Sequence, residues 1–289
     1  MENKYDNKIF LSTGCYFNST SFQVVEELSK HGLTSFELSG GNFDPEFDRK
    51  LDQFKSQFNL QIHNYSPPPE IPFVFNLASF KEEVYNRSLE HIKQAIEISS
   101  KLNREFFGFH AGYLVDPDPM ELGQRFVKRS MQDRNKSLQL FIDRVIEISK
   151  FAKEYNIRLL IENNVVSANN FKSFGEDAFL FSEPDEAKTL IEALPENVGV
   201  LLDIAHLKVS SNTLSYDPIQ FIEVCNPKIL AYHISDNNGL SDSNDSIQEN
   251  FWFWNYLKKD ALSYTLEIKN ATPESLRQQI ELLKSKICN

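Results

Sequence analysis

The sequence predicts an α/β protein that folds as a single (β/α)8 TIM barrel. Eight short runs rich in β-branched, aromatic and aliphatic residues follow one another along the 289 residues. Segments with helical periodicity or helix-capping signals separate these runs, and strand–helix alternation repeated eight times favours a closed barrel over an open sheet. No Gly/Ser-rich linker or shift in composition divides the chain. We therefore expect one barrel domain over residues 1–289, with its active site at the carboxyl ends of the strands.

The expected strands are short and strongly apolar. They cover residues 9–16, 35–41, 60–66, 106–113, 158–164, 198–206, 229–237 and 263–270. Leu159-Leu160-Ile161 in the fifth run and Val200-Leu201-Leu202 in the sixth are continuously apolar. Strands that helices cover on both faces have this pattern, and parallel sheets are the usual case.

The segments between the strands carry helix signals. Asp44-Pro45, Asp217-Pro218 and Thr272-Pro273 each place a capping side chain before a proline suited to the first helical turn. Residues 90–102 and 141–155 have apolar side chains at helical spacing. Two connections, 114–136 and 165–183, are longer than a barrel requires. Because both follow carboxyl ends of strands, they are either active-site lids or simple elaborations.

Composition and charge restrict the classes of partner. The net charge is −11, and the densest basic group, within residues 125–136, forms no stripe suited to a phosphate backbone. No segment approaches the roughly 20 apolar residues of a membrane span. The three cysteines form no CxxC motif or disulfide framework. We expect a cytoplasmic protein with no membrane partner. The acidic net charge weighs against a nucleic-acid partner, and the sequence leaves a homo-oligomer open.

Charged and imidazole side chains stand at the predicted carboxyl ends of six strands. They are His63, His110, Glu162, Asp203, His206, His233, Asp236 and Glu267. Alone, each of these could pair within a hydrogen-bond network or with an arginine. Barrel closure brings them to one rim, where several buried acceptors repel one another unless a cation is present. The set therefore predicts a metal site.

Glu162, Asp203, His233 and Glu267 provide three carboxylates and one imidazole. This oxygen-rich set favours one divalent ion, with Mn²⁺ preferred and Mg²⁺, Co²⁺ or Zn²⁺ as alternatives. The chain contains no GxGxxG, GxxxxGK[ST], HExxH or GxSxG motif that would indicate another chemistry.

Four strings in order along the chain resemble the xylose-isomerase-like barrel superfamily, which includes sugar isomerases, ketose 3-epimerases and the endonuclease IV branch. The strings are Leu160-Ile161-Glu162-Asn163, Leu201-Leu202-Asp203-Ile204-Ala205-His206, His233-Ile234-Ser235-Asp236-Asn237 and Leu266-Glu267. Each is short, and their ordered set carries the resemblance over nearly the whole chain.

The resemblance to ketose epimerases implies that Glu162, Asp203, His233 and Glu267 hold one metal ion. It also implies that Glu162 and Glu267 are the catalytic pair, exchanging protons with a sugar through an enediolate. Five further residues are expected to contact the substrate: His63, His110, His206, Asp236 and Lys269. Lys208, like Lys269, lies near a strand end and could supply positive charge. An arginine that often follows the strand-seven histidine in these epimerases is absent, which leaves recognition of a phosphate there open.

The endonuclease IV branch implies a different site on the same scaffold. There, His63 and His110 would join Glu162 at one of three zinc ions, and His206 would join an Asp-x-His pair at another. This chain has Asp242-Ser243-Asn244 in that place, and no histidine follows His233. The resemblance thus leaves three hypotheses: a metal-dependent isomerase or epimerase of a small sugar, sugar phosphate or polyol; a metal-dependent phosphodiesterase; and a non-catalytic metal-binding barrel.

Overall fold

The computed structural model describes residues 7–16, 18–121 and 125–288, and its eight parallel strands close into a barrel. The strands are β1 Ile9–Ser12, β2 Ser35–Ser39, β3 Asn59–His63, β4 Phe106–His110, β5 Arg158–Glu162, β6 Val198–Asp203, β7 Ile229–Ile234 and β8 Ser263–Leu266. Each strand pairs with its sequence neighbours, and β1 pairs with β8 to close the ring. The predicted (β/α)8 TIM barrel is confirmed.

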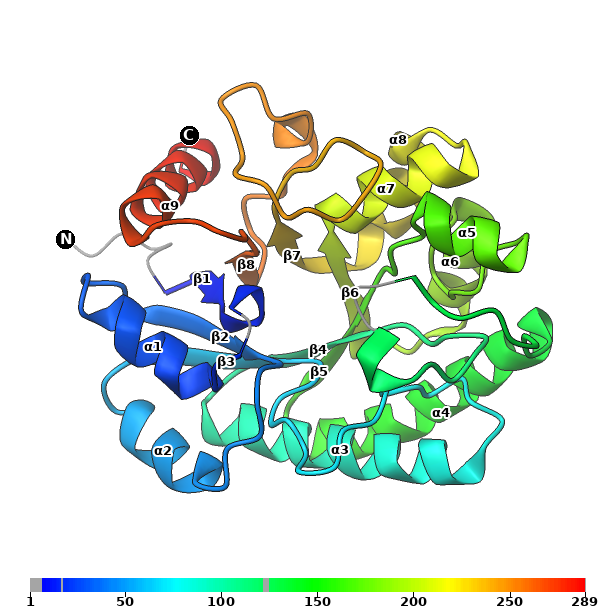
Figure 1. Ribbon diagram of the computed structural model, residues 1–289, viewed down its shortest axis with the longest axis horizontal. Helices are drawn as coiled ribbons and strands as arrows, with labels where there is room; N and C mark the ends of the chain where they lie inside the picture. Colours follow the sequence, from blue (N-terminus) through cyan, green and yellow to red (C-terminus); the bar gives the residue numbers. More distant parts are fainter. Residues whose placement is uncertain (1–6, 17, 122–124, 289) are drawn as a thin grey trace.

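Helices surround the strands, and Figure 1 shows them spread around the outside of the barrel. The α-helices are α1 Ser21–Ser29, α2 Phe47–Phe54, α3 Glu82–Lys101, α4 Arg134–Glu154, α5 Ala168–Phe174, α6 Pro184–Ala193, α7 Ile204–Leu214, α8 Pro218–Cys225 and α9 Pro273–Ile287. Asp217 and Thr272 cap α8 and α9 as predicted. The prediction for Asp44-Pro45 is wrong, because α2 begins at Phe47 and Asp44 instead accepts a hydrogen bond from the Glu46 amide.

Alternation along each strand separates two packing environments. Outward side chains such as Phe107, Phe109 and Ile161 belong to the large core between strands and helices. Inward side chains form a smaller cluster of Phe106, Leu160, Leu201 and Ala231 inside the barrel. One inward layer above this cluster, at the carboxyl ends of the strands, the side chains become polar.

The expected strands extend too far at their carboxyl ends. Every observed strand ends earlier than the sequence indicated, so Asp236 lies beyond β7 and Glu267 directly follows β8. His206 was expected to end the sixth strand, but it lies in the first turn of α7, which begins at Ile204. The apolar run continues across the strand–helix boundary, and the sequence pattern therefore does not mark it.

The two long connections pack against each other over the β4 and β5 ends. Leu114 donates its amide to Ala178 O, and the Asn164 amide group donates to carbonyls on both sides of the contact, Gly112 O and Leu180 O. Residues 122–124 of the first connection lie outside the described residues, as does the polar stretch 1–6. Within the described part of the chain, no helix is long and apolar enough to cross a membrane.

Candidate metal centre at the carboxyl ends of the strands

In the predicted metal set, the carboxylates of three residues lie around one atom of the fourth residue, His233 Nδ1. This nitrogen lies 3.3 Å from Glu162 Oε1, 3.6 Å from Glu267 Oε2 and 3.9 Å from Asp203 Oδ2. The side chains of Glu162, Asp203 and His233 are each only 1% exposed, while that of Glu267 is 16% exposed. Within the described residues, His233 Nδ1 and Asp203 Oδ2 are buried without a hydrogen-bond partner.

The local chain fixes Asp203 so that only one oxygen is free. Asp203 is the N-cap of α7, and its Oδ1 accepts a hydrogen bond from the His206 amide at 2.7 Å. Asn163 holds the Asp203 backbone from both sides, accepting from Asp203 N and donating to Asp203 O. Because these contacts occupy Oδ1 and the backbone, Oδ2 remains to face His233 and His206.

His63 and His110 form a second group with Glu162, on the other side of its carboxylate. His63 Nε2 lies 2.9 Å and His110 Nδ1 3.5 Å from Glu162 Oε2. One ligand atom from each of the three residues lies within 4.8 Å of the others, as is also true of Asp203, His233 and Glu267. Glu162 therefore stands between two adjacent groups that could each hold an ion.

His206 connects the centre to Asp242, a residue that the strand-end pattern did not single out as a ligand. His206 Nδ1 faces Asn163 O at 2.9 Å, and Nε2 lies 3.6 Å from both Asp203 Oδ2 and Asp242 Oδ2. Asn244 is buried and donates its amide to Ser235 Oγ. Among the residues that the structure describes, no group of three potential ligands includes Asp242.

The remaining predicted substrate contacts differ in their positions. Lys269 lines the cavity above the metal set, and its Nζ donates to Asp242 O at 3.3 Å. Asp236 is engaged elsewhere, since its Oδ1 accepts from Lys208 Nζ at 2.6 Å and its backbone pairs with Asp245. The same ion pair occupies Lys208, which leaves Lys269 as the lysine that faces the cavity.

This cavity has a volume of about 210 Å³ and lies at the carboxyl ends of the strands. Its lining is mainly polar and consists of Gly14, Cys15, Ser39, His63, Asn64, His110, Glu162, His206, Asp242, Asn244, Glu267 and Lys269. Drug-sized ligands usually occupy apolar pockets of about 300–1,000 Å³, so this cavity suits a smaller and more polar molecule.

Electrostatics show why the centre favours a cation. Burial would raise the pKa of Glu162, but the rings of His110, His233 and His63 hold it well below its usual range. Burial raises the pKa of Asp203 to about 7, and the carboxylates of Glu162, Asp242 and Glu267 add to this effect. Burial lowers the pKa of His110 to about 3, so this ring is neutral and can act as a ligand. An ion that neutralises the carboxylates would remove the cost of ionising Asp203. The donor set thus fits a divalent metal.

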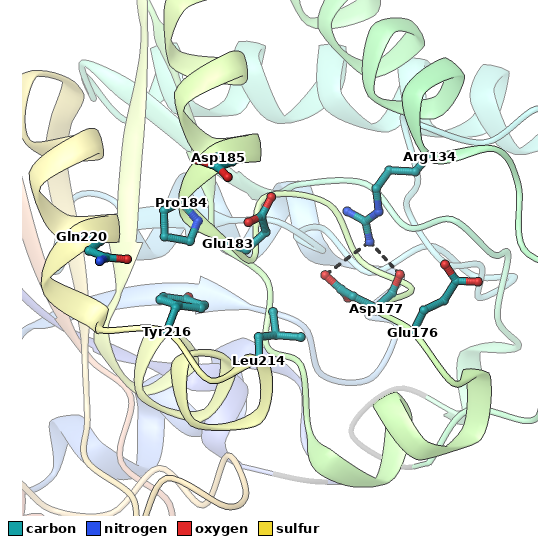
Figure 2. Close-up of a pocket in the computed structure, with 9 residues that line it drawn as sticks. All are labelled: Arg134, Glu176, Asp177, Glu183, Pro184, Asp185, Leu214, Tyr216 and Gln220. Atoms are coloured by element: carbon teal, nitrogen blue, oxygen red, sulfur yellow. Dashed lines mark hydrogen bonds and ion pairs between the residues drawn. The ribbon is translucent and has the colours of Figure 1, made fainter.

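A second cavity lies away from this centre and has a different character. Figure 2 shows Arg134 at its edge, directed at Asp177, with Glu176, Glu183 and Asp185 nearby. Arg134 also contacts Glu186 Oε2 at 2.6 Å and the carbonyl of Phe179. The arginine is thereby committed to joining α4 to the start of α6, and we assign this region a structural role.

Comparison with known proteins places the chain in a protein family. The model of the xylose isomerase-like TIM barrel family matches residues 25–286. An uncharacterized protein of Methanocaldococcus jannaschii is 25% identical over 287 residues, which are 96% of this chain and 98% of that protein. A probable endonuclease 4 of Sulfurihydrogenibium sp. is 23% identical over 201 residues, 68% of this chain and 63% of its own.

Solved structures give the same result for the fold. The crystal structure of a D-tagatose 3-epimerase-like protein superposes with a TM-score of 0.71 at 22% identity and covers 97% of both chains. Structures of sugar epimerases are among the other neighbours. At this level of identity the likeness establishes the barrel, and the site must be argued from its own residues.

The raised pKa of Asp203 generates a test on metal-free protein. Because the pKa of Asp203 is higher in the folded than in the unfolded protein, its protonated carboxyl adds to the free energy of unfolding below about pH 4. This contribution is lost as the pH rises through about 7 and the buried carboxyl ionises. Asp203→Asn keeps a capping oxygen but cannot ionise. With chelator present, we expect the free energy of unfolding of this variant to exceed that of the wild type by on the order of 1–3 kcal/mol at pH 8, and by less at pH 5.

Urea unfolding at both pH values measures the difference. Added Mn²⁺ should stabilise the wild type at pH 8 and stabilise the variant much less, since one ligand is lost. A variant that is less stable than the wild type at pH 8 in chelator would show that ionisation of the buried Asp203 carboxyl does not destabilise the folded protein.

Proposed function

Because the chain belongs to the xylose isomerase-like TIM barrel family, we propose that it is a metal-dependent isomerase or epimerase of a small sugar, sugar phosphate or polyol. The observation that carries this proposal is the pair Glu162 and Glu267, which lie within 3.6 Å of the same imidazole nitrogen and both line the polar cavity. The sugar epimerases among the structural neighbours support it.

Glu162, Asp203, His233 and Glu267 would hold one divalent ion, with Mn²⁺ preferred. When bound, the ion supplies Lewis acidity that polarises a carbonyl and its neighbouring hydroxyl. One glutamate then accepts the proton on the carbon beside the carbonyl, which leaves an enediolate. The other glutamate, protonated at the outset, gives its proton to the opposite face of the enediolate, so the two glutamates exchange protonation states. The sum of these two transfers changes neither the atoms nor the oxidation state of the sugar as a whole.

The environment of each glutamate suits this exchange. The rings around Glu162 keep its carboxylate ionised and able to accept a proton. Glu267 is the more exposed of the two and therefore the nearer to an entering substrate. His63, His110, His206 and Lys269 would orient the hydroxyls of the sugar, and a proposed contact from Asp236 would require release of Lys208.

Glu267→Gln tests the proton-transfer role. The amide keeps one oxygen for the ion but cannot accept a proton, so we expect turnover of any accepted sugar to fall by about 10²–10⁴. Exchange of the carbon-bound hydrogen with solvent deuterium, followed by NMR in D2O, should fall in parallel. Metal content is measured in the same samples. Glu70→Gln, an exposed residue in the connection after β3, is the matched control.

Near-normal exchange in a metal-loaded Glu267→Gln protein would contradict the proton-transfer role. A hydride-shift isomerase or a hydrolase on the same barrel would then be the better explanation.

One observation favours a second function, metal-dependent hydrolysis of phosphodiesters. The His63–His110–Glu162 group could place a second ion next to the first, and paired ions are common in phosphodiester cleavage. The relative named as a probable endonuclease 4 agrees with this alternative. The net charge of −11 weighs against it, since a nucleic-acid backbone requires a basic surface.

Metal stoichiometry separates the two functions. Because Asp242 lies in no three-ligand group among the described residues and Asn244 replaces a histidine, we expect one tight ion and at most a weaker second one. Elemental analysis after mild chelation and reloading measures the count, and a plasmid-nicking assay accompanies it. Three tightly bound zinc ions with nicking activity would place the phosphodiesterase first.

A further inference from the structure

A buried polar network lies beneath the metal set, inside the barrel. Glu37 of β2 is fully buried, and its Oε2 accepts hydrogen bonds from Gln61 Nε2 at 2.7 Å and Thr265 Oγ1 at 3.0 Å. Gln61 also exchanges hydrogen bonds with Ser263. TIM barrel interiors are usually filled by branched aliphatic side chains, so a carboxylate at this depth requires a specific reason.

Strand periodicity places this network one layer below the site. Gln61 precedes His63 by two residues and Thr265 precedes Glu267 by two, so each pair points inward on the same side of its strand. The matching positions below Glu162 and Asp203 are Leu160 and Leu201, which are apolar. The layer is therefore polar only on the β8, β2 and β3 side, and that is the side towards which His233 Nε2 points.

The second carboxylate oxygen of Glu37 faces His233. Glu37 Oε1 lies 3.0 Å from His233 Nε2, and within the described residues neither atom has a properly aligned hydrogen bond to any group. Ionised Glu37 can only accept, so the nitrogen that faces it is best occupied by a hydrogen. The other ring nitrogen, Nδ1, is then the one with a free lone pair, and it faces Glu162, Asp203 and Glu267.

We propose that Glu37 is a positioning residue that holds the Nε2–H form of His233 and thereby aims Nδ1 at the metal set. A carboxylate behind a metal-binding histidine fixes the ring and increases its basicity, and loss of such a partner typically costs 10–100-fold in affinity. Gln61 and Thr265 in turn fix the Glu37 carboxylate. This inference rests on the proposed metal site but not on the reaction performed there.

The double variant Glu37→Gln/Gln61→Glu tests the role with little disturbance of the core. It exchanges the carboxylate and the amide, so the volume and the number of buried charges stay the same, and Ser263 and Thr265 can still donate to the relocated carboxylate. Only the charge behind His233 is lost. We expect Mn²⁺ affinity, measured by competition with a fluorescent chelator, to fall about 10–100-fold at unchanged stoichiometry. Ser263→Ala is the control, because it removes a hydroxyl from the same buried layer but none of the donors to Glu37, and its affinity should stay close to that of the wild type.

NMR of the Zn²⁺-loaded wild type supplies a readout that depends on no variant. The His233 ring should carry its hydrogen on Nε2, with a low-field resonance that moves upfield in the double variant. A hydrogen on Nδ1, or wild-type affinity in the double variant, would overturn the proposal. Loss of one whole equivalent of metal would also overturn it, since Glu37 would then be a ligand together with His63 and His233, whose ligand atoms lie within 4.8 Å of it. If affinity falls as expected while no sugar undergoes exchange, the positioning role holds and the proposed function fails.

Discussion

Three carboxylates meet at one buried imidazole nitrogen at the carboxyl ends of the strands. Glu162, Asp203 and Glu267 approach His233 Nδ1 within 3.3–3.9 Å, and three of these four side chains are almost completely buried. In a medium of low polarity, such acceptors repel one another and lose their hydration. Protons can relieve part of this conflict, as the raised pKa of Asp203 indicates, and a divalent cation relieves more of it.

The fold supports this arrangement through groups that contact Asp203 and His233 from outside the centre. A helix N-cap and the Asn163 side chain fix Asp203, and the Glu37 carboxylate stands behind His233. Each of these contacts leaves one atom directed at the centre. Preorganisation of this kind means that an entering ion does not have to reorder its ligands, so less binding energy is lost in doing so.

Much of the centre could be predicted from the sequence, because closure of the barrel brings the carboxyl ends of all eight strands to one rim. The strand runs that end in Glu162, Asp203 and His233 are short apolar segments followed by a ligand residue, and any closed parallel barrel brings such ends together. The residues wrongly placed at strand ends are those where the apolar pattern does not mark the end of the strand. His206 follows an apolar run that passes from strand to helix, and Asp236 lies beyond its strand in a loop whose path depends on Lys208.

Glu37 escaped notice for a different reason, and Asp242 was indicated only by the resemblance to the endonuclease IV branch, not by the strand-end pattern. Glu37 lies in the middle of a strand, where a single charged residue is usually interpreted as an outward-facing side chain. Its inward direction becomes clear from the register with Gln61 and the closure through β8. Strict alternation in Ser35-Phe36-Glu37-Leu38-Ser39, with apolar residues on the helix side, was the available signal. Asp242 approaches His206 through the fold of the long loop after β7, which no local pattern encodes.

The most direct test of the central claim is a crystal structure of the Mn²⁺-loaded protein, with the ion located by anomalous scattering. We expect one strongly occupied ion with an oxygen or nitrogen of Glu162, Asp203, His233 and Glu267 about 2.0–2.6 Å away, bound to His233 through Nδ1. An ion held elsewhere, or no ion bound while the four side chains keep their present positions, would contradict it.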